Sequence, residues 1–210
     1  MVVPVLFPRH SSALSSPPVL PVAPFLLEQV GFQTHGDIIG RLRVQAWRSE
    51  RGIDPVFFAR PSWIEVLDEE AQHWVITEAG VAVAAARLSH HISLTDVPYA
   101  YLLPPHTQQQ QRLQHRKIAA LSRMVVASSH RGQGFSSVLD RVRVDGALAG
   151  GADLLTAATQ LHFRQKALTK LGFDTLCELR KAPERPEWPL YFMVHHASVP
   201  SSPAPATNPV

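Results

Sequence analysis

The spacing of hydrophobic positions changes several times along the chain, and each change predicts a new element. From Ile38 to Trp47, apolar residues recur every three to four positions, which predicts an amphipathic helix. Ordered structure is expected to begin near Gly36. Two β-prone runs at 74–77 and 81–88, separated by a short glycine-containing turn, predict an antiparallel hairpin.

The second half of the chain alternates between strand-like and helix-like patterns, after a long loop expected over residues 90–117. The predicted elements are a strand at 118–126, a helix at 138–149, a strand at 154–158, a helix at 161–171, and two strands at 173–179 and 190–194. This order requires a parallel crossover in the middle and antiparallel pairs at the edges. The predicted fold class is α/β (α+β), a mixed, mostly antiparallel central sheet flanked by helices.

The length of 210 residues favours one domain, and the positions of the prolines suggest its limits. Six of the 18 prolines fall within residues 1–30 and four within the last 14 residues. We therefore expect Pro-rich tails at 1–35 and 197–210 around a domain at 36–196. No apolar stretch approaches the roughly 18 residues of a membrane helix, so neither a span nor secretion is predicted, and a cytoplasmic location is expected.

Composition adds two constraints to this outline. The formal net charge is only +3, but residues 112–143 hold seven Lys or Arg and one acid, which favours an anionic ligand. A nucleic-acid module would also explain basic residues, but the sequence contains no recognised nucleic-acid-binding motif. The single cysteine, Cys177, cannot form an internal disulfide and is expected to be a buried structural thiol.

A glycine loop joins the strand at 118–126 directly to the next helix. Such a junction points unpaired backbone N–H groups and the positive end of the helix dipole at one position, an arrangement that binds phosphate. Gly132 and Gly134 let the backbone approach a bulky pyrophosphate closely, and Arg131 can add charge-assisted hydrogen bonds. The loop lacks the Gly-Lys-Ser/Thr of a P-loop, and Ser137 replaces the third glycine of a dinucleotide fingerprint.

The segment LSRMVV at 121–126, followed after four residues by RGQG at 131–134, resembles the acyl-CoA motif R-x-x-G-x-G/A of the GNAT superfamily of N-acyltransferases. The segment LTKLGF at 168–173 is similar to the family's helix ending in Leu-Gly-Phe. The likeness covers about residues 36–196. The Ser122-Arg123 pair also resembles autoinducer and N-acyl amino acid synthases.

The resemblance implies an acyl-CoA substrate whose pantetheine arm pairs with a strand and whose pyrophosphate lies on the glycine loop. The implied contact residues are Met124, Val125 and Val126 for the arm, and Arg131, Gly132, Gln133, Gly134, Phe135 and Ser136 for the pyrophosphate. A splayed or bulged strand would offer the unpaired amides that this requires. The expected partners are acyl-CoA and an amine that attacks the thioester directly; a homodimer is also considered.

The expected activity is transfer of an acyl group, with acetyl first, to a primary amine. A longer-chain N-acyl amino acid or autoinducer synthase is one alternative, and a non-catalytic acyl-CoA sensor is another. The tyrosine that many family members use as a general acid aligns with Leu168, and the glutamate of the related synthases aligns with Ala120. No catalytic residue is therefore assigned. His162 is a candidate, with a capping or surface role as its alternative.

Three other groups of polar residues have two interpretations each. The acidic run of Glu65, Asp68, Glu69 and Glu70 predicts an exposed turn, with a group that binds or deprotonates the acceptor amine as its alternative. Arg123 either organises the site or pairs with an acid on the outer face. The pairs at 90–91 and 195–196 are adjacent histidines without the spacing of a zinc site, so no metal is expected.

Overall fold

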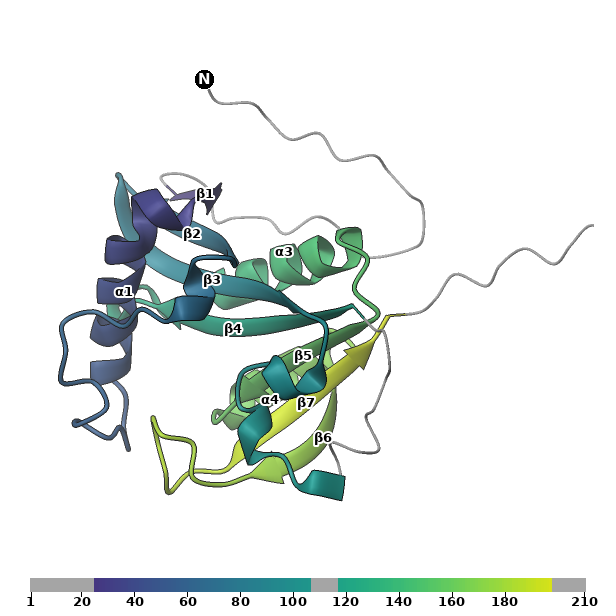
Figure 1. Ribbon diagram of the computed structural model, residues 1–210. Coiled ribbons are helices and arrows are strands. Elements are labelled where there is room, and N and C mark those ends of the chain that lie inside the picture. Colours follow the sequence, from purple (N-terminus) through teal and green to yellow (C-terminus); the bar gives the residue numbers. More distant parts are fainter. Residues whose placement is uncertain (1–24, 107–116, 198–210) are drawn as a thin grey trace, which may run out of the picture.

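One mixed sheet of seven strands organises the computed structural model, which describes residues 25–106 and 117–197 (Figure 1). Its strands are β1 Phe25–Val30, β2 Gln72–Glu78, β3 Val81–His91, β4 Ile118–Val126, β5 Leu154–Thr159, β6 Asp174–Leu179 and β7 Leu190–His196. Its α-helices are α1 Phe32–Arg48, α3 Phe135–Ala149 and α4 His162–Thr169. Short 3-10 segments lie at η1 Val66–Asp68, η2 Leu94–Asp96, η3 Ala100–Leu102 and η4 Ser128–His130.

The strand order is β1-β2-β3-β4-β5-β7-β6, and every neighbouring pair is antiparallel except β4 and β5. The parallel pair is joined by α3, which makes the crossover that a parallel connection needs. The predicted fold class, a mostly antiparallel mixed sheet with one parallel crossover and flanking helices, is therefore confirmed.

Alternate residues of the central strands face different helices. Trp74 and Ile76 of β2 belong to the apolar cluster under α3, whereas Val75 packs with Ile39 and Leu42 of α1. Since successive side chains of a strand point to opposite faces, α1 and α3 cover opposite faces of the sheet, as Figure 1 shows.

The second half of the sheet is covered differently on its two faces. Leu168 of α4 and Phe173 extend the cluster under α3. On the other face, Leu94 and Leu103 from the segment with η2 and η3 pack near Phe192 of β7. A single helix, α4, thus covers one face here, and a short irregular segment covers the other.

Ordered structure begins earlier than the expected boundary at residue 36. The strand β1 and the first turn of α1 both lie in the segment assigned to a tail, and β1 pairs with β2 from Phe25↔Glu78 to Val30↔His73. The strand was missed because its stabilising partner is distant in sequence. The rest of both expected tails, 1–24 and 198–210, lies outside the described residues, as does the glutamine run at 108–111.

None of the helices in the described ranges has the length and apolar character that a membrane span requires.

Candidate functional site

The parallel strands β4 and β5 separate halfway along their length. They pair from Ile118↔Leu154 to Leu121↔Ala157 and no further, although β4 continues to Val126. Beyond that point β5 stays in the sheet through its pairing with β7. One edge of β4 after residue 121 therefore faces a gap instead of a neighbouring strand, and its backbone groups are available to a ligand.

The other edge of β4 carries a bulge at the same level. Arg87 of β3 pairs with Ser122, but Ala85 pairs with Val125, so two residues of β4 stand opposite one of β3. Arg123, in the bulge, has a φ of 50°, a left-handed conformation that is unfavourable for a residue with a side chain. The bulged strand expected from the sequence is present, and it turns the Arg123 side chain away from the regular strand direction.

The glycine loop after β4 has the geometry expected of an anion site. Gly132 and Gly134 have φ values of 80° and 84°, and a Cβ added at either would meet no atom within 4 Å. Gly134 precedes α3, whose first turn begins at Phe135 and leaves N–H groups without acceptors in the helix. Open space, free amides and the positive helix end therefore coincide.

Two residues of this loop hold it against the rest of the protein. The Phe135 side chain is 1% exposed and packs edge-on against Phe25, with ring centroids 4.8 Å apart. The Arg131 guanidinium pairs with Glu50 at 2.8 Å and donates to the Ala46 carbonyl at 3.0 Å. Arg131 thus reaches toward the C-terminal end of α1, and the amides of the loop are the groups left facing the open space.

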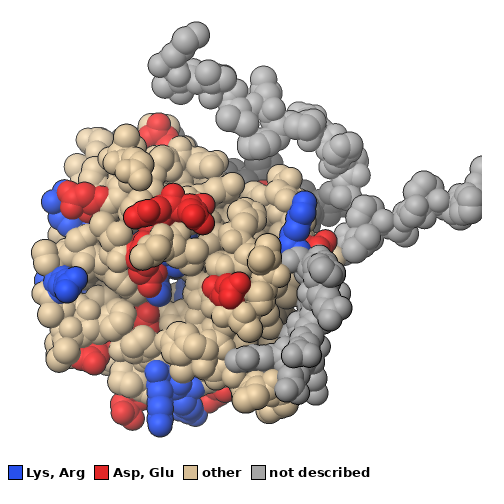
Figure 2. Space-filling view, viewed as in Figure 1, with Lys and Arg blue, Asp and Glu red and all other residues tan. Residues whose placement is uncertain are grey.

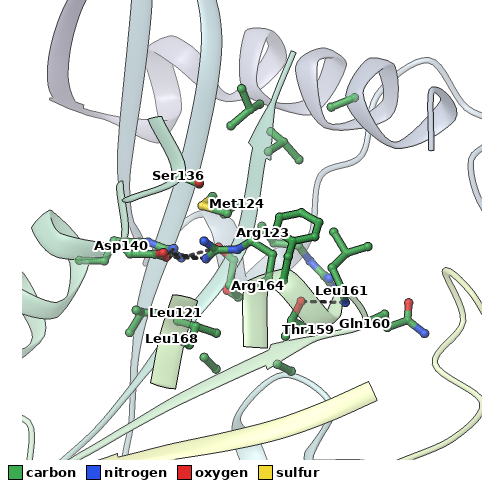
Figure 3. Close-up of a pocket in the computed structure, with 18 of the residues that line it drawn as sticks. Leu121, Arg123, Met124, Ser136, Asp140, Thr159, Gln160, Leu161, Arg164 and Leu168 are labelled. Atoms are coloured by element: carbon green, nitrogen blue, oxygen red, sulfur yellow. Dashed lines mark hydrogen bonds and ion pairs between the residues drawn. The ribbon is translucent and has the colours of Figure 1, made fainter. Parts of the chain in front are cut away.

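A cavity of about 490 Å³ occupies the gap between β4 and β5 (Figure 3). Of the nine residues expected to contact CoA, all except Gln133 line it. Its apolar wall includes Leu121, Ala157, Leu168, Leu190 and Phe192. The volume lies within the range of small-molecule sites.

The charged lining of this cavity is mainly positive. Its members are the five arginines Arg123, Arg131, Arg143, Arg164 and Arg185, and the two carboxylates Glu50 and Asp140. Figure 3 shows Asp140 and Arg164 facing each other. Asp140 accepts from Arg143 at 2.7 Å and from Arg164 at 2.7 Å, and all three side chains are at least nine-tenths buried. Burial and the Arg164 charge, opposed by Asp140, lower the pKa of Arg143 to about 10, so that it stays charged at neutral pH.

The surface in Figure 2 has a different distribution of charge. On this face, Lys and Arg atoms occur as separate groups, several of them near Asp or Glu atoms. A basic lining inside a hollow is suited to an anionic small molecule.

No protein-family model and no curated protein sequence matches the chain. Solved structures do match: arylalkylamine N-acetyltransferase 2 from Aedes aegypti has a TM-score of 0.61 at 17% identity, over 83% of this chain and 99% of its own. The N-acyl amino acid synthase FeeM from uncultured soil microbes has a TM-score of 0.57 at 13% identity, over 82% of this chain and 90% of its own. A chain of the NatC complex bound to Gag peptide and CoA has a TM-score of 0.57 at 9% identity, over 83% of this chain and 99% of its own.

The chain has the GNAT fold. Because the sequence identities of these matches are low, the matches establish the fold and not the activity. The divergence of β4 and β5 and the glycine loop before α3 are features of this chain's own structure.

Within this GNAT fold, Glu69 and Glu70 of the acidic run before β2 are exposed as expected, but Glu65 and Asp68 are not. Glu65 accepts from Arg123 at 2.6 and 2.7 Å. Asp68 is fully buried and accepts from Arg43 and Arg87, each at 2.8 Å. The prediction was wrong for Glu65 and Asp68 because the arginines come from α1, β3 and β4, and this convergence depends on the tertiary fold.

The ion pairs set the charge state of these carboxyl groups. Burial alone would raise the pKa of Glu65, but the hydrogen bond and charge of Arg123 outweigh it and the pKa lies below its usual value. The same balance, with Arg43 as the main partner, holds the pKa of Asp68 well below its usual range. Both groups are therefore ionised at neutral pH.

Arg123 lines the cavity and pairs with the half-buried Glu65 and the buried Glu184, so its acidic partners are not the outer-face acid considered for it. Its guanidinium lies 4.1 Å from the centre of the Trp63 ring and donates to the Tyr99 hydroxyl at 2.8 Å and to Glu184 at 3.1 Å. The Tyr99 hydroxyl donates in turn to Glu184 at 2.7 Å. Burial and the Glu184 charge raise the pKa of Tyr99 well above its usual value, against the opposing charge of Arg123.

The residues considered for catalysis lie in different surroundings. His162 is exposed at the start of α4, contacts Gln165 at 2.9 Å and is not among the cavity-lining residues. Leu168, which stands in place of the family's tyrosine, is buried and lines the cavity. Tyr99 also lines the cavity, and sequence analysis missed it because it lies in an irregular loop without a motif.

No group of three or more His, Cys, Asp or Glu side chains in the described ranges could hold a metal ion. Cys177 is a free thiol, partly buried against the cluster that contains Phe192, and burial raises its pKa.

Proposed function

We propose that the protein is an N-acyltransferase that moves an acyl group from acyl-CoA to a primary amine. The observation that carries this proposal is the continuity of one cavity with both the open edge of β4 and the glycine loop before α3. A pantetheine arm needs backbone groups of an unpaired strand edge, and a pyrophosphate needs amides at a helix start. The same cavity offers both.

The CoA contacts proposed from the sequence are refined by the position of Arg131. Because its guanidinium is paired with Glu50, we assign the pyrophosphate mainly to the amides of Gly132–Ser136 rather than to this side chain. The open edge at Met124 and Val126 would hold the pantetheine arm. The NatC match was solved with CoA bound, which supports a CoA ligand for this architecture.

The proposed reaction is direct transfer. The amine nitrogen attacks the thioester carbonyl carbon, the C–S bond breaks, the amine loses a proton to water, and the CoA thiolate leaves and gains a proton. We assign to the phenol of Tyr99, which lines the cavity and keeps its proton because its pKa is raised, a hydrogen bond to the leaving sulfur in place of the one to Glu184, and water supplies the thiolate's proton. Holding the amine and the thioester close together in the gap would supply much of the rate.

The acyl group can be acetyl or longer. Acetyl remains the first expectation, and the apolar wall that includes Leu168, Leu190 and Phe192 favours the longer-chain alternative. The match to an N-acyl amino acid synthase points the same way. A cytoplasmic location and a homodimer stay predictions.

The test is thermal unfolding and calorimetry with CoA, acetyl-CoA, decanoyl-CoA, NAD and ATP, followed by turnover with amines. CoA species should raise the melting temperature by several degrees at about 100 times the dissociation constant, whereas NAD and ATP should not. No shift with any CoA species would refute the proposal. CoA binding without turnover of any amine would instead favour the acyl-CoA sensor.

A further inference from the structure

One arginine of the cavity remains outside the proposed CoA contacts. Arg185 lies in the connection between β6 and β7, lines the cavity, and has a side chain that is only 1% exposed. Its guanidinium lies 5.1 Å from the Trp47 ring centre and 4.7 Å from that of Trp188. Its Nη2 donates to Glu50 at 2.9 Å. Two aromatic rings and one carboxylate therefore stabilise this cation beside the cavity.

The hydrogen-bonding capacity of Arg185 is only partly used. Its Nε and Nη1 are buried and have no hydrogen-bond partner among the described residues. Buried N–H groups on a charged side chain are costly when unpaired, and most find an acceptor in a native structure. A guanidinium beside a cavity with two of its nitrogens unpaired indicates that an acceptor arrives with a ligand.

The local charge balance points to an anionic acceptor. Glu50 binds Arg131 through Oε1 at 2.8 Å and Arg185 through Oε2 at 2.9 Å, so one carboxylate serves two arginines. One positive charge is left over at this side of the cavity. An oxyanion would balance the charge and also accept from the unpaired nitrogens.

We infer that the acceptor amine carries a carboxylate, as an α-amino acid does, and that Arg185 binds it. The inference rests on the proposed function. Arg185 lies in the β6–β7 connection, whereas the phosphate-binding amides lie in the glycine loop before α3. Arg131 of the glycine loop already occupies the other carboxylate oxygen of Glu50. A ligand that approaches the gap from the β6–β7 connection is therefore the acceptor. Because Nε and Nη1 are shielded in this structure, the guanidinium must shift slightly when the carboxylate binds.

The first test compares matched acceptors with the wild-type protein. Phenylalanine is paired with 2-phenylethylamine, and leucine with 3-methylbutylamine, each with acetyl-CoA and with decanoyl-CoA, and release of the CoA thiol is followed. Each amino acid should have a kcat/KM at least about tenfold above that of the amine that lacks the carboxylate. Equal or better use of the two amines would overturn the inference without touching the proposed function.

The second test removes the charge. Arg185→Gln should raise KM for the amino acids about 10- to 100-fold, leave the amines unaffected, and leave the calorimetric Kd for CoA unchanged. The matched control is Arg180→Gln, since Arg180 lies just after β6, has a side chain 63% exposed, and pairs only with Glu178 among the described residues. Arg180→Gln should change neither the KM for the amino acids nor the Kd for CoA.

Loss of CoA affinity in Arg185→Gln, with amino acids and amines impaired alike, would assign the guanidinium to a phosphate of CoA and overturn the inference. If thermal unfolding shows that Arg185→Gln is not folded, Arg185→Lys, which keeps the charge, replaces it. The comparison of acceptors with the wild-type protein still decides whether the acceptor carries a carboxylate. Absence of both CoA binding and turnover would refute the proposed function, and this inference with it.

Discussion

Replacing Gly134 by valine separates the ligand-binding role of the glycine loop from its role as a turn. Gly134 has a φ of 84°, and a Cβ there would meet no atom within 4 Å. The cost to folding is therefore conformational rather than steric, about 1 to 2 kcal/mol for a residue with a side chain in the left-handed region. In a chain of this size, that lowers the melting temperature by roughly 2 to 8 °C and leaves a folded protein.

The effect on CoA should be much larger than the effect on stability. The new side chain would occupy the open space in front of the free amides of α3, where the pyrophosphate is proposed to bind. Displacing or blocking these hydrogen bonds should weaken CoA binding at least about 100-fold. Calorimetry with CoA measures this loss directly, and thermal unfolding measures the stability of the same sample.

Gly80 provides the matched control. It has a φ of 80° and equally open surroundings, but it lies in the turn between β2 and β3 and does not line the cavity. Gly80→Val should therefore lose similar stability and keep its full CoA affinity. If Gly134→Val retains CoA affinity, or if Gly80→Val loses as much of it, the assignment of the loop is wrong.

Two further predictions concern the polar groups around the bulge of β4. Because the pKa values of Glu65 and Asp68 lie below their ordinary values of 4.5 and 3.8, their ion pairs contribute fully above about pH 4.5. This contribution is lost as the pH falls toward the folded-state values, so the free energy of unfolding in urea should drop below pH 4.5, and less steeply in Glu65→Gln. Tyr99→Phe removes the proposed hydrogen bond to the leaving sulfur and should lower kcat about 10²-fold or more with CoA affinity unchanged. Tyr101→Phe, at a 67% exposed position nearby, should keep full activity; a normal kcat in Tyr99→Phe would remove Tyr99 from the mechanism.

The parts of the fold that the sequence predicts well are those encoded locally. The strand at 118–126 has the predicted limits, since its apolar run is continuous and a loop follows it. The helix predicted from residue 138 begins at Phe135, because Gly134 takes the left-handed conformation that allows α3 to start there. The strand β1 was missed because it depends on pairing with β2.

The same distinction applies to the site. The glycine loop and the open strand are adjacent in sequence, so a local motif identifies them. The ion pairs are not local: Glu65 lies 58 positions from Arg123, and Glu50 lies 135 positions from Arg185. One local signal was available, because Arg143 occupies the buried face of α3 at helical spacing between Leu139 and Ala147. A charged residue at such a position indicates a buried partner.

The short pairing between β4 and β5 has a mechanical consequence. The two halves of the sheet, β1 to β4 and β5 to β7, share one ladder that ends at Leu121↔Ala157. A ladder of this length resists relative rotation less than strands paired along their whole length would. A substrate that spans the gap limits that rotation, so its binding should slow amide hydrogen exchange in strands on both sides. Slower exchange on both sides would show that occupancy of the cavity and rigidity of the sheet are thermodynamically linked, and unchanged exchange would show that they are not.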